Sequence, residues 1–152
     1  MAAAPKAVLA NFGTPQVLIY SYTCAASLPL SKGTLVELVD PFTVSMANAW
    51  TASTLATSGA FVGIVFRDKA AGDTEVQVSV LKEGRADIRA SGAITKGFPV
   101  YCAGNDEVMA LSATMNAGVS NAVSIGLFNS MMVGIAEETA TDQEVILVRF
   151  NK

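Results

Sequence analysis

The sequence predicts an all-β protein: a small β-barrel or sandwich built from two similar β units and preceded by an extended N-terminal arm. Three observations lead to this prediction. Short valine-rich runs alternate between apolar and polar residues, glycine-containing turns separate these runs, and several short motifs occur twice in the same order. The 152 residues are enough for one domain with a substantial core.

Seven segments have the composition of β-strands. Residues 75–80 alternate strictly, which places Val76, Val78 and Val80 on one face of a strand. The other segments alternate in the same way or are rich in β-branched and aromatic residues: 16–23, 33–39, 61–66, 85–90, 98–102 and 144–150. Turn-forming residues lie between them. Short strands at this spacing are typical of a barrel or a sandwich.

The second half of the chain repeats the first. The repeated motifs are Leu-Ser-Lys-Gly at 30–33 and Ile-Thr-Lys-Gly at 94–97, Val-Gly-Ile at 62–64 and 133–135, and Glu-Val at 75–76 and 144–145. Because the shift grows from 64 positions to 71, the second copy has seven additional residues within 107–132. The same comparison pairs Val76 with Val145. Two copies are too few for a solenoid, so we expect two β units that close on one shared core.

Charge is scarce along the chain. Only 15% of the residues are charged, the net charge is −3, and residues 7–31, 41–66 and 108–136 contain no Asp, Glu, Lys or Arg. Pro, Gly, Asn and Ser interrupt these stretches, which argues against membrane-spanning helices. The negative net charge argues against a nucleic-acid partner. A surface with so little charge is typical of one that partners cover, so we expect self-association.

The residues that carry most enzyme chemistry are missing or badly placed. The absence of histidine excludes every catalytic or metal site that needs an imidazole. The sequence also lacks nucleotide-binding and nucleophile-elbow motifs. Cys24 and Cys102 form no C-x-x-C motif, so we expect buried thiols and synthesis in the cytoplasm. We therefore expect no enzymatic activity, no cofactor, no metal and no small-molecule substrate.

The first 30 residues form a separate N-terminal arm or edge strand, ahead of a duplicated β domain at 31–152. This segment lies outside the duplication and carries three prolines together with Phe12, Tyr20 and Tyr22. An extended arm of this kind adds a strand to a neighbouring molecule and places its aromatic side chains in pockets there. Residues 16–23 fit equally well as an extra strand on the chain's own barrel.

Aromatic and methionine side chains in the uncharged segments are the candidates for an interface. Trp50 is either a lid over one barrel end or an interface anchor. Methionine usually fills cores, but one member of the pair at 131–132 must point outward on a strand. The full set of candidates is Phe12, Tyr20, Tyr22, Trp50, Met115, Phe128, Met131 and Met132.

Residues 30–152 resemble the capsid decoration, or cement, proteins of tailed bacteriophages. The resemblance rests on the Lys-Gly turn at 32–33, Val-Gly-Ile at 62–64, the segment 71–80, Glu-Gly at 83–84, Ile-Thr-Lys-Gly-Phe-Pro-Val-Tyr at 94–101, Val-Gly-Ile-Ala at 133–136 and the closing strand at 144–150. It implies a β-barrel-like structural protein without catalytic residues. Such proteins bind the outer capsid surface, often as homotrimers, and cement neighbouring capsomers of the major capsid protein.

The chain departs from this family in its N-terminal arm and in longer spacers at 41–58 and 109–128, so the family's contact geometry is not carried over. The resemblance implies a place on the outer surface of the virion, where the interface candidates would contact the capsid or other copies. Two alternatives remain open. One is a tail or baseplate subunit, and the other is a small-ligand-binding β-barrel that serves as an accessory domain of an enzyme.

Overall fold

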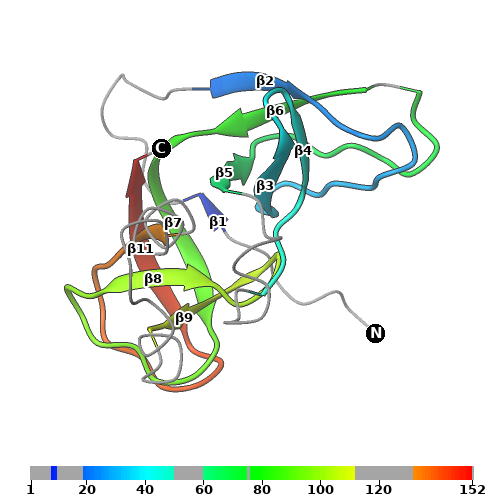
Figure 1. The fold of residues 1–152 in the computed structure, drawn as a ribbon. Coiled ribbons are helices and arrows are strands. Elements are labelled where there is room, and N and C mark those ends of the chain that lie inside the picture. Colours follow the sequence, from blue (N-terminus) through cyan, green and yellow to red (C-terminus); the bar gives the residue numbers. More distant parts are fainter. Residues whose placement is uncertain (1–7, 10–18, 50–59, 75, 112–131, 152) are drawn as a thin grey trace.

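The computed structural model describes residues 8–9, 19–49, 60–74, 76–111 and 132–151, and every regular element among them is a β-strand. The strands are β1 (Val8–Leu9), β2 (Ile19–Thr23), β3 (Leu35–Asp40), β4 (Thr43–Met46), β5 (Phe61–Val65), β6 (Gln77–Leu81), β7 (Glu83–Ala90), β8 (Pro99–Cys102), β9 (Glu107–Ala110), β10 (Met132–Ala136) and β11 (Val145–Asn151). The expected all-β class and the two similar β units are confirmed. Each unit is a barrel-like sheet of five strands (Figure 1).

The two barrels have the same strand order. The first is closed in the order β2-β4-β3-β5-β6. The second, which closes through a pairing of β7 with β9, has the order β7-β9-β8-β10-β11 when it is followed in the same direction. In each barrel a single pair is parallel, β2 with β4 and β7 with β9, and the other pairs are antiparallel. Strand β1 adds to the second sheet along β7.

The registers of the strands also match. Val36 opposes Gly63 in the first barrel, and Val100 opposes Gly134 in the second, at shifts of 64 and 71 positions. The turns before β3 and β8 are held alike, since the backbone N–H of Lys32 donates to Asp68 and that of Lys96 donates to Thr139. The duplication seen in the motifs is therefore a duplication of the fold.

Three details differ from the sequence prediction. Strand β2 is a member of the first barrel, as in the own-barrel alternative for residues 16–23, but it is the counterpart of β7 and not an addition to the duplicated unit, so the first copy begins earlier than its motifs indicate. The short strands β4 and β9, one in each copy, were not expected. The pairing of Val76 with Val145 is wrong by one residue. Cys24 N donates to Val76 O (2.8 Å) and Ala90 N donates to Glu144 O (2.7 Å), so Val76 corresponds to Glu144.

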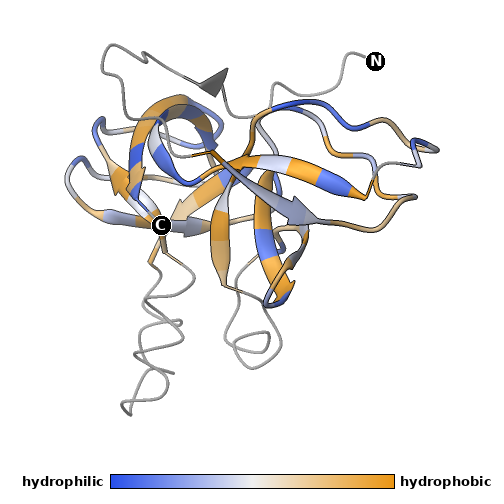
Figure 2. Cartoon of the chain, turned by 90° about the horizontal axis from the view of Figure 1, so that it is seen from above, coloured by the Kyte–Doolittle hydropathy of each residue, from blue (hydrophilic) through white to orange (hydrophobic). Residues whose placement is uncertain are grey.

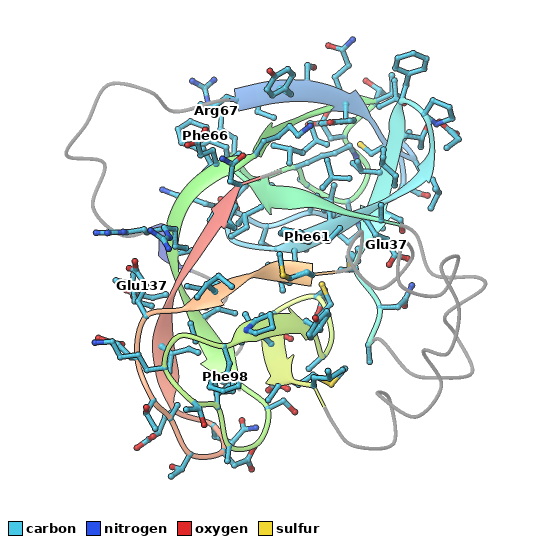
Figure 3. The ribbon with its side chains drawn as sticks, turned by 60° about the vertical axis from the view of Figure 1, so that its left-hand side comes forward. Glu37, Phe61, Phe66, Arg67, Phe98 and Glu137 are labelled. Carbon is cyan, nitrogen blue, oxygen red and sulfur yellow. The ribbon has the colours of Figure 1, made fainter. Side chains whose placement is uncertain are left out.

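Two clusters of buried side chains fill the molecule, and apolar residues alternate with polar ones along several strands (Figure 2). The interior of the first barrel is one cluster, built from Cys24, Leu30, Val36, Val44, Val62, Val65, Val78 and Val80. The larger cluster combines the interior of the second barrel with an outward face of the first. Each unit thus closes around its own interior, so the expectation of one shared core is wrong. Phe61 belongs to this shared region, and Figure 3 shows it between the two barrels.

The outward face that the first barrel buries is a row of three aliphatic residues. Leu35 opposes Ile64, Ile64 opposes Leu81, and each is 0% exposed. Burial of each such side chain contributes roughly 1.5–3 kcal/mol. Asn105, in the turn between β8 and β9, accepts a hydrogen bond from Leu35 N (2.8 Å) and donates one to Met46 Sδ (3.1 Å). These contacts join the barrels.

The same row in the second barrel reads Pro99, Ile135 and Arg149. The Arg149 side chain is 62% exposed and lies 4.0 Å from a carboxylate oxygen of Glu137. The copies therefore differ at this position. The first copy has leucine, which the second barrel covers, and the second copy has arginine, which is exposed.

Both barrels also require the backbone of one strand to pass very close to its neighbour. A Cβ atom at Gly63 would overlap the carbonyl oxygen of Leu81, and one at Gly134 would overlap that of Arg149. Glycine is needed at both positions because nothing larger fits between the strands.

We expect Gly63→Ala and Gly134→Ala each to lower the free energy of unfolding by roughly 2–3 kcal/mol, because the added methyl group forces the strands apart. Urea denaturation followed by circular dichroism measures this. Gly104→Ala is the control, since the nearest atom to its new Cβ is 3.8 Å away. A loss for Gly104→Ala as large as for the other two variants would contradict the close-approach explanation.

Exchange of the diverged residues tests the junction between the barrels. Leu81→Arg should destabilise the protein by roughly 3 kcal/mol or more, because it buries an unpaired charge. Arg149→Leu removes only an exposed ion pair and should change stability by less than about 1 kcal/mol. The same denaturation experiment compares them, and equal effects would argue against a buried junction at Leu81.

Candidate interaction surface

The structure describes three of the eight interface candidates. Tyr20 is half exposed on β2, and Nζ of Lys82 lies 5.1 Å from its ring centroid, a cation–π contact. Tyr22 is partly buried and packs against the core of the first barrel. Met132 begins β10 and lies opposite Tyr101, partly buried. The other candidates, Phe12, Trp50, Met115, Phe128 and Met131, lie outside the described residues.

Sequence reasoning missed an apolar surface at one end of the first barrel. Phe42 is 75% exposed in the turn between β3 and β4, Val39 beside it is 60% exposed, and Val76 is 48% exposed. Phe42 and Val76 lie on the two sides of the end of β2, since their carbonyl oxygens accept hydrogen bonds from the adjacent amides of Thr23 and Cys24. We call Val39, Phe42 and Val76 the Phe42 patch. It lies at the end toward which the β2 arrow points in Figure 1.

Although the Phe42 side chain is exposed, its backbone is held firmly. Oδ1 of Asp40 accepts hydrogen bonds from the amides of Phe42 (3.0 Å) and Thr43 (2.9 Å). The carbonyl oxygen of Phe42 accepts hydrogen bonds from both the amide and the hydroxyl of Thr23, each 2.8 Å long. Pro41 further restricts the turn. An aromatic side chain presented on a fixed backbone loses little entropy when a partner covers it.

Comparison of the two copies shows that the fold does not need apolar residues in the patch. The positions that correspond to Val39 and Phe42 are Ala103 and Asp106, at the shift of 64 positions that holds along β3–β4 and β8–β9. Val76 corresponds to Glu144. The second barrel closes in the same way with alanine and two carboxylates there. This comparison is the signal in the sequence that could have revealed the patch.

The patch has one charged group in its turn, the carboxylate of Asp40. The amide of Phe42, together with the hydroxyl of Thr43, holds the pKa of Asp40 below its ordinary value, so the group is ionised at neutral pH. Residues 33–66, which carry Val39 and Phe42, contain no lysine or arginine. The patch is therefore apolar with a negative charge beside it.

The second barrel presents a different surface. Arg85 lies 3.1 Å from Glu137, and Arg89 lies 3.8 Å from Glu107, so two ion pairs lie on this barrel. Phe98, at 61%, and Val145, at 53%, are exposed apolar side chains on this barrel. Figure 3 shows Phe98 on the second barrel, away from Phe61 and the junction.

The described residues offer little for catalysis. No group of three or more Asp, Glu, Cys or His among them could hold a metal ion. Cys24 and Cys102 are both buried thiols, as expected, and lie in different core clusters. Within the described ranges, no helix is sufficiently long and apolar to cross a membrane.

Comparison with solved structures finds a similar fold in the crystal structure of the head fiber gp8.5 N base of bacteriophage phi29. The similarity covers 90% of this chain and 95% of that chain, with a TM-score of 0.50 and 13% sequence identity. At this identity it shows a shared fold, and it does not single out the decoration family. The chain matches no protein-family model and no curated protein.

The turn at Asp40 makes stability depend on pH. The pKa of Asp40 is lower in the folded chain than its ordinary value of 3.8. Its ionised form therefore stabilises the fold above that pH, and this contribution is lost as the pH falls through the lowered pKa. Asp40→Asn should reduce the melting temperature at pH 7 and have no effect near pH 2. Thermal melts across this range measure the difference, and an equal difference at both pH values would contradict the account.

Proposed function

We propose that the chain is a structural protein of a phage virion that binds the outer surface of the head. The observation that carries the proposal is the shared fold with the head fiber N base, which extends over nearly the whole of both chains. The Phe42 patch supports it, because exposed apolar side chains on a rigid backbone are typical of a binding surface. The same features support a non-enzymatic role.

In its finer form, the proposal is that the chain cements neighbouring capsomers of the major capsid protein and does so as a homotrimer. The low charge of the chain supports self-association. A protein that binds the assembled shell but not loose subunits stabilises the shell by mass action. At a concentration one hundred times its Kd, each occupied site contributes about 2.7 kcal/mol.

A second form of the proposal is an attachment base for an appendage on the head. The description of the phi29 protein as the N base of a head fiber favours this form. The small-ligand alternative is disfavoured by the interior of the first barrel, which is filled by buried residues such as Val36, Val44 and Val80. A tail or baseplate subunit differs from both forms in its place on the virion.

The proposal is tested with phage heads assembled without the chain and incubated with the purified protein. We expect the protein to cosediment with heads and not with unassembled major capsid protein. Electron microscopy should place its density on the outer surface.

Two further results separate the alternatives. If the chain is a cement protein, saturated heads should withstand heating to a higher temperature than bare heads. Binding without such a gain favours the attachment base. Density on tails, or no binding to any part of the virion, would contradict the proposal.

A further inference from the structure

Two properties distinguish the Phe42 patch from an ordinary exposed surface and indicate that a binding partner covers it. Its central side chain is 75% exposed, while four hydrogen bonds hold the backbone around it. The equivalent positions in the other barrel are alanine, aspartate and glutamate. Folding alone therefore does not account for Val39, Phe42 and Val76.

A second copy bound patch to patch is a poor occupant. Three side chains are few beside the roughly 20–30 residues per partner in a stable interface. A two-fold contact through the patch would also bring together the Asp40 carboxylates of both copies, and like charges repel at such a distance. The patch is better suited to a surface that is apolar with a basic rim.

A repeated surface compensates for the small size of the patch. When several linked copies bind several identical sites at once, the effective concentration at each further site is high, and the overall affinity exceeds that of one contact by 10²–10⁴-fold, as an order of magnitude. The regular outer face of a phage head is such a surface. A rigid aromatic side chain seated in a pocket is the usual centre of a contact of this size.

We infer that the Phe42 patch is the face through which the chain contacts the head, with Phe42 inserted into an apolar pocket that has a basic rim. This inference rests on the proposed function and adds to it the contact surface and the anchoring residue. It places the Arg85, Glu137 and Arg149 cluster of the second barrel away from the contact.

The test uses variants for which the chain itself supplies the design. Val39→Ala, Phe42→Asp and Val76→Glu combined give the first barrel the residues of the second, which folds with them. Phe42→Ala is a milder variant that leaves Asp40 and the turn intact. Phe98→Asp is the matched control, because it removes another exposed phenylalanine, on the other barrel. Thermal melts of all three should stay close to that of the unsubstituted protein.

Binding to heads assembled without the chain is measured by cosedimentation over a range of protein concentrations. We expect the triple variant to bind at least 30-fold more weakly, the order expected for an interface anchor, and Phe42→Ala at least 10-fold more weakly. Phe98→Asp should bind within about 3-fold of the unsubstituted chain, as expected for a position outside the contact. Light scattering of each protein without heads reports the oligomeric state.

The outcomes separate this inference from the proposed function. If the unsubstituted chain binds heads and the patch variants bind equally tightly, the inference is overturned while the proposed function stands. If the patch variants lose self-association, the patch is a contact between copies and the inference is again overturned. If the unsubstituted chain binds no heads, both fail together. Only a loss of head binding confined to the patch variants supports the inference.

Discussion

The close approach of two strands inside each barrel is the constraint on which the remaining architecture depends. In β5 and β10 a glycine lies where any Cβ atom would overlap a carbonyl oxygen of the neighbouring strand, so the two backbones can approach this closely only at a residue without a side chain. Gly63 and Gly134 occupy the same register position, opposite Val36 and Val100, in two barrels that have the same strand order. The residues that follow these glycines, Ile64 and Ile135, belong to the outward rows, and in the first barrel this row forms the junction with the second.

Residues that differ between the two copies lie where the surroundings of the two barrels differ. Where the barrels meet, the first copy has Leu81 and the second has Arg149. A similar exchange occurs at Lys69, whose counterpart is Ala140. Lys69 is 5% exposed, and its Nζ donates to the carbonyl oxygens of Ala26 (2.7 Å) and Leu28 (3.1 Å), which secures a loop that is two residues longer in the first copy. Each of these substitutions has a structural reason in the folded chain.

The sequence was sufficient to predict the fold class, the duplication and most strands, because valine-rich alternation and repeated glycine turns are local signals. It did not reveal β4 and β9, whose four residues each are too few to show a period. It also did not identify the Phe42 patch. Tyr22 and Phe42 both lie in uncharged stretches of the sequence. Tyr22 nevertheless packs against the core, whereas Phe42 is exposed by a turn that only the folded backbone defines. Exposure depends on contacts between distant segments, which local patterns do not encode.

The exposed position of Phe42 is informative because the turn beneath it is rigid. A flexible loop with an apolar tip would lose conformational entropy on binding, on the order of 1 kcal/mol or more for each residue that becomes ordered. Here the Asp40 carboxylate and Thr23 already hold the backbone, so burying the ring against a partner costs little further backbone entropy. The second barrel has Gly104 and Asp106 at the positions of Asp40 and Phe42. The two copies therefore differ at this end of the barrel, which exposes Val39, Phe42 and Val76 in the first copy and has Ala103, Asp106 and Glu144 at the same positions in the second.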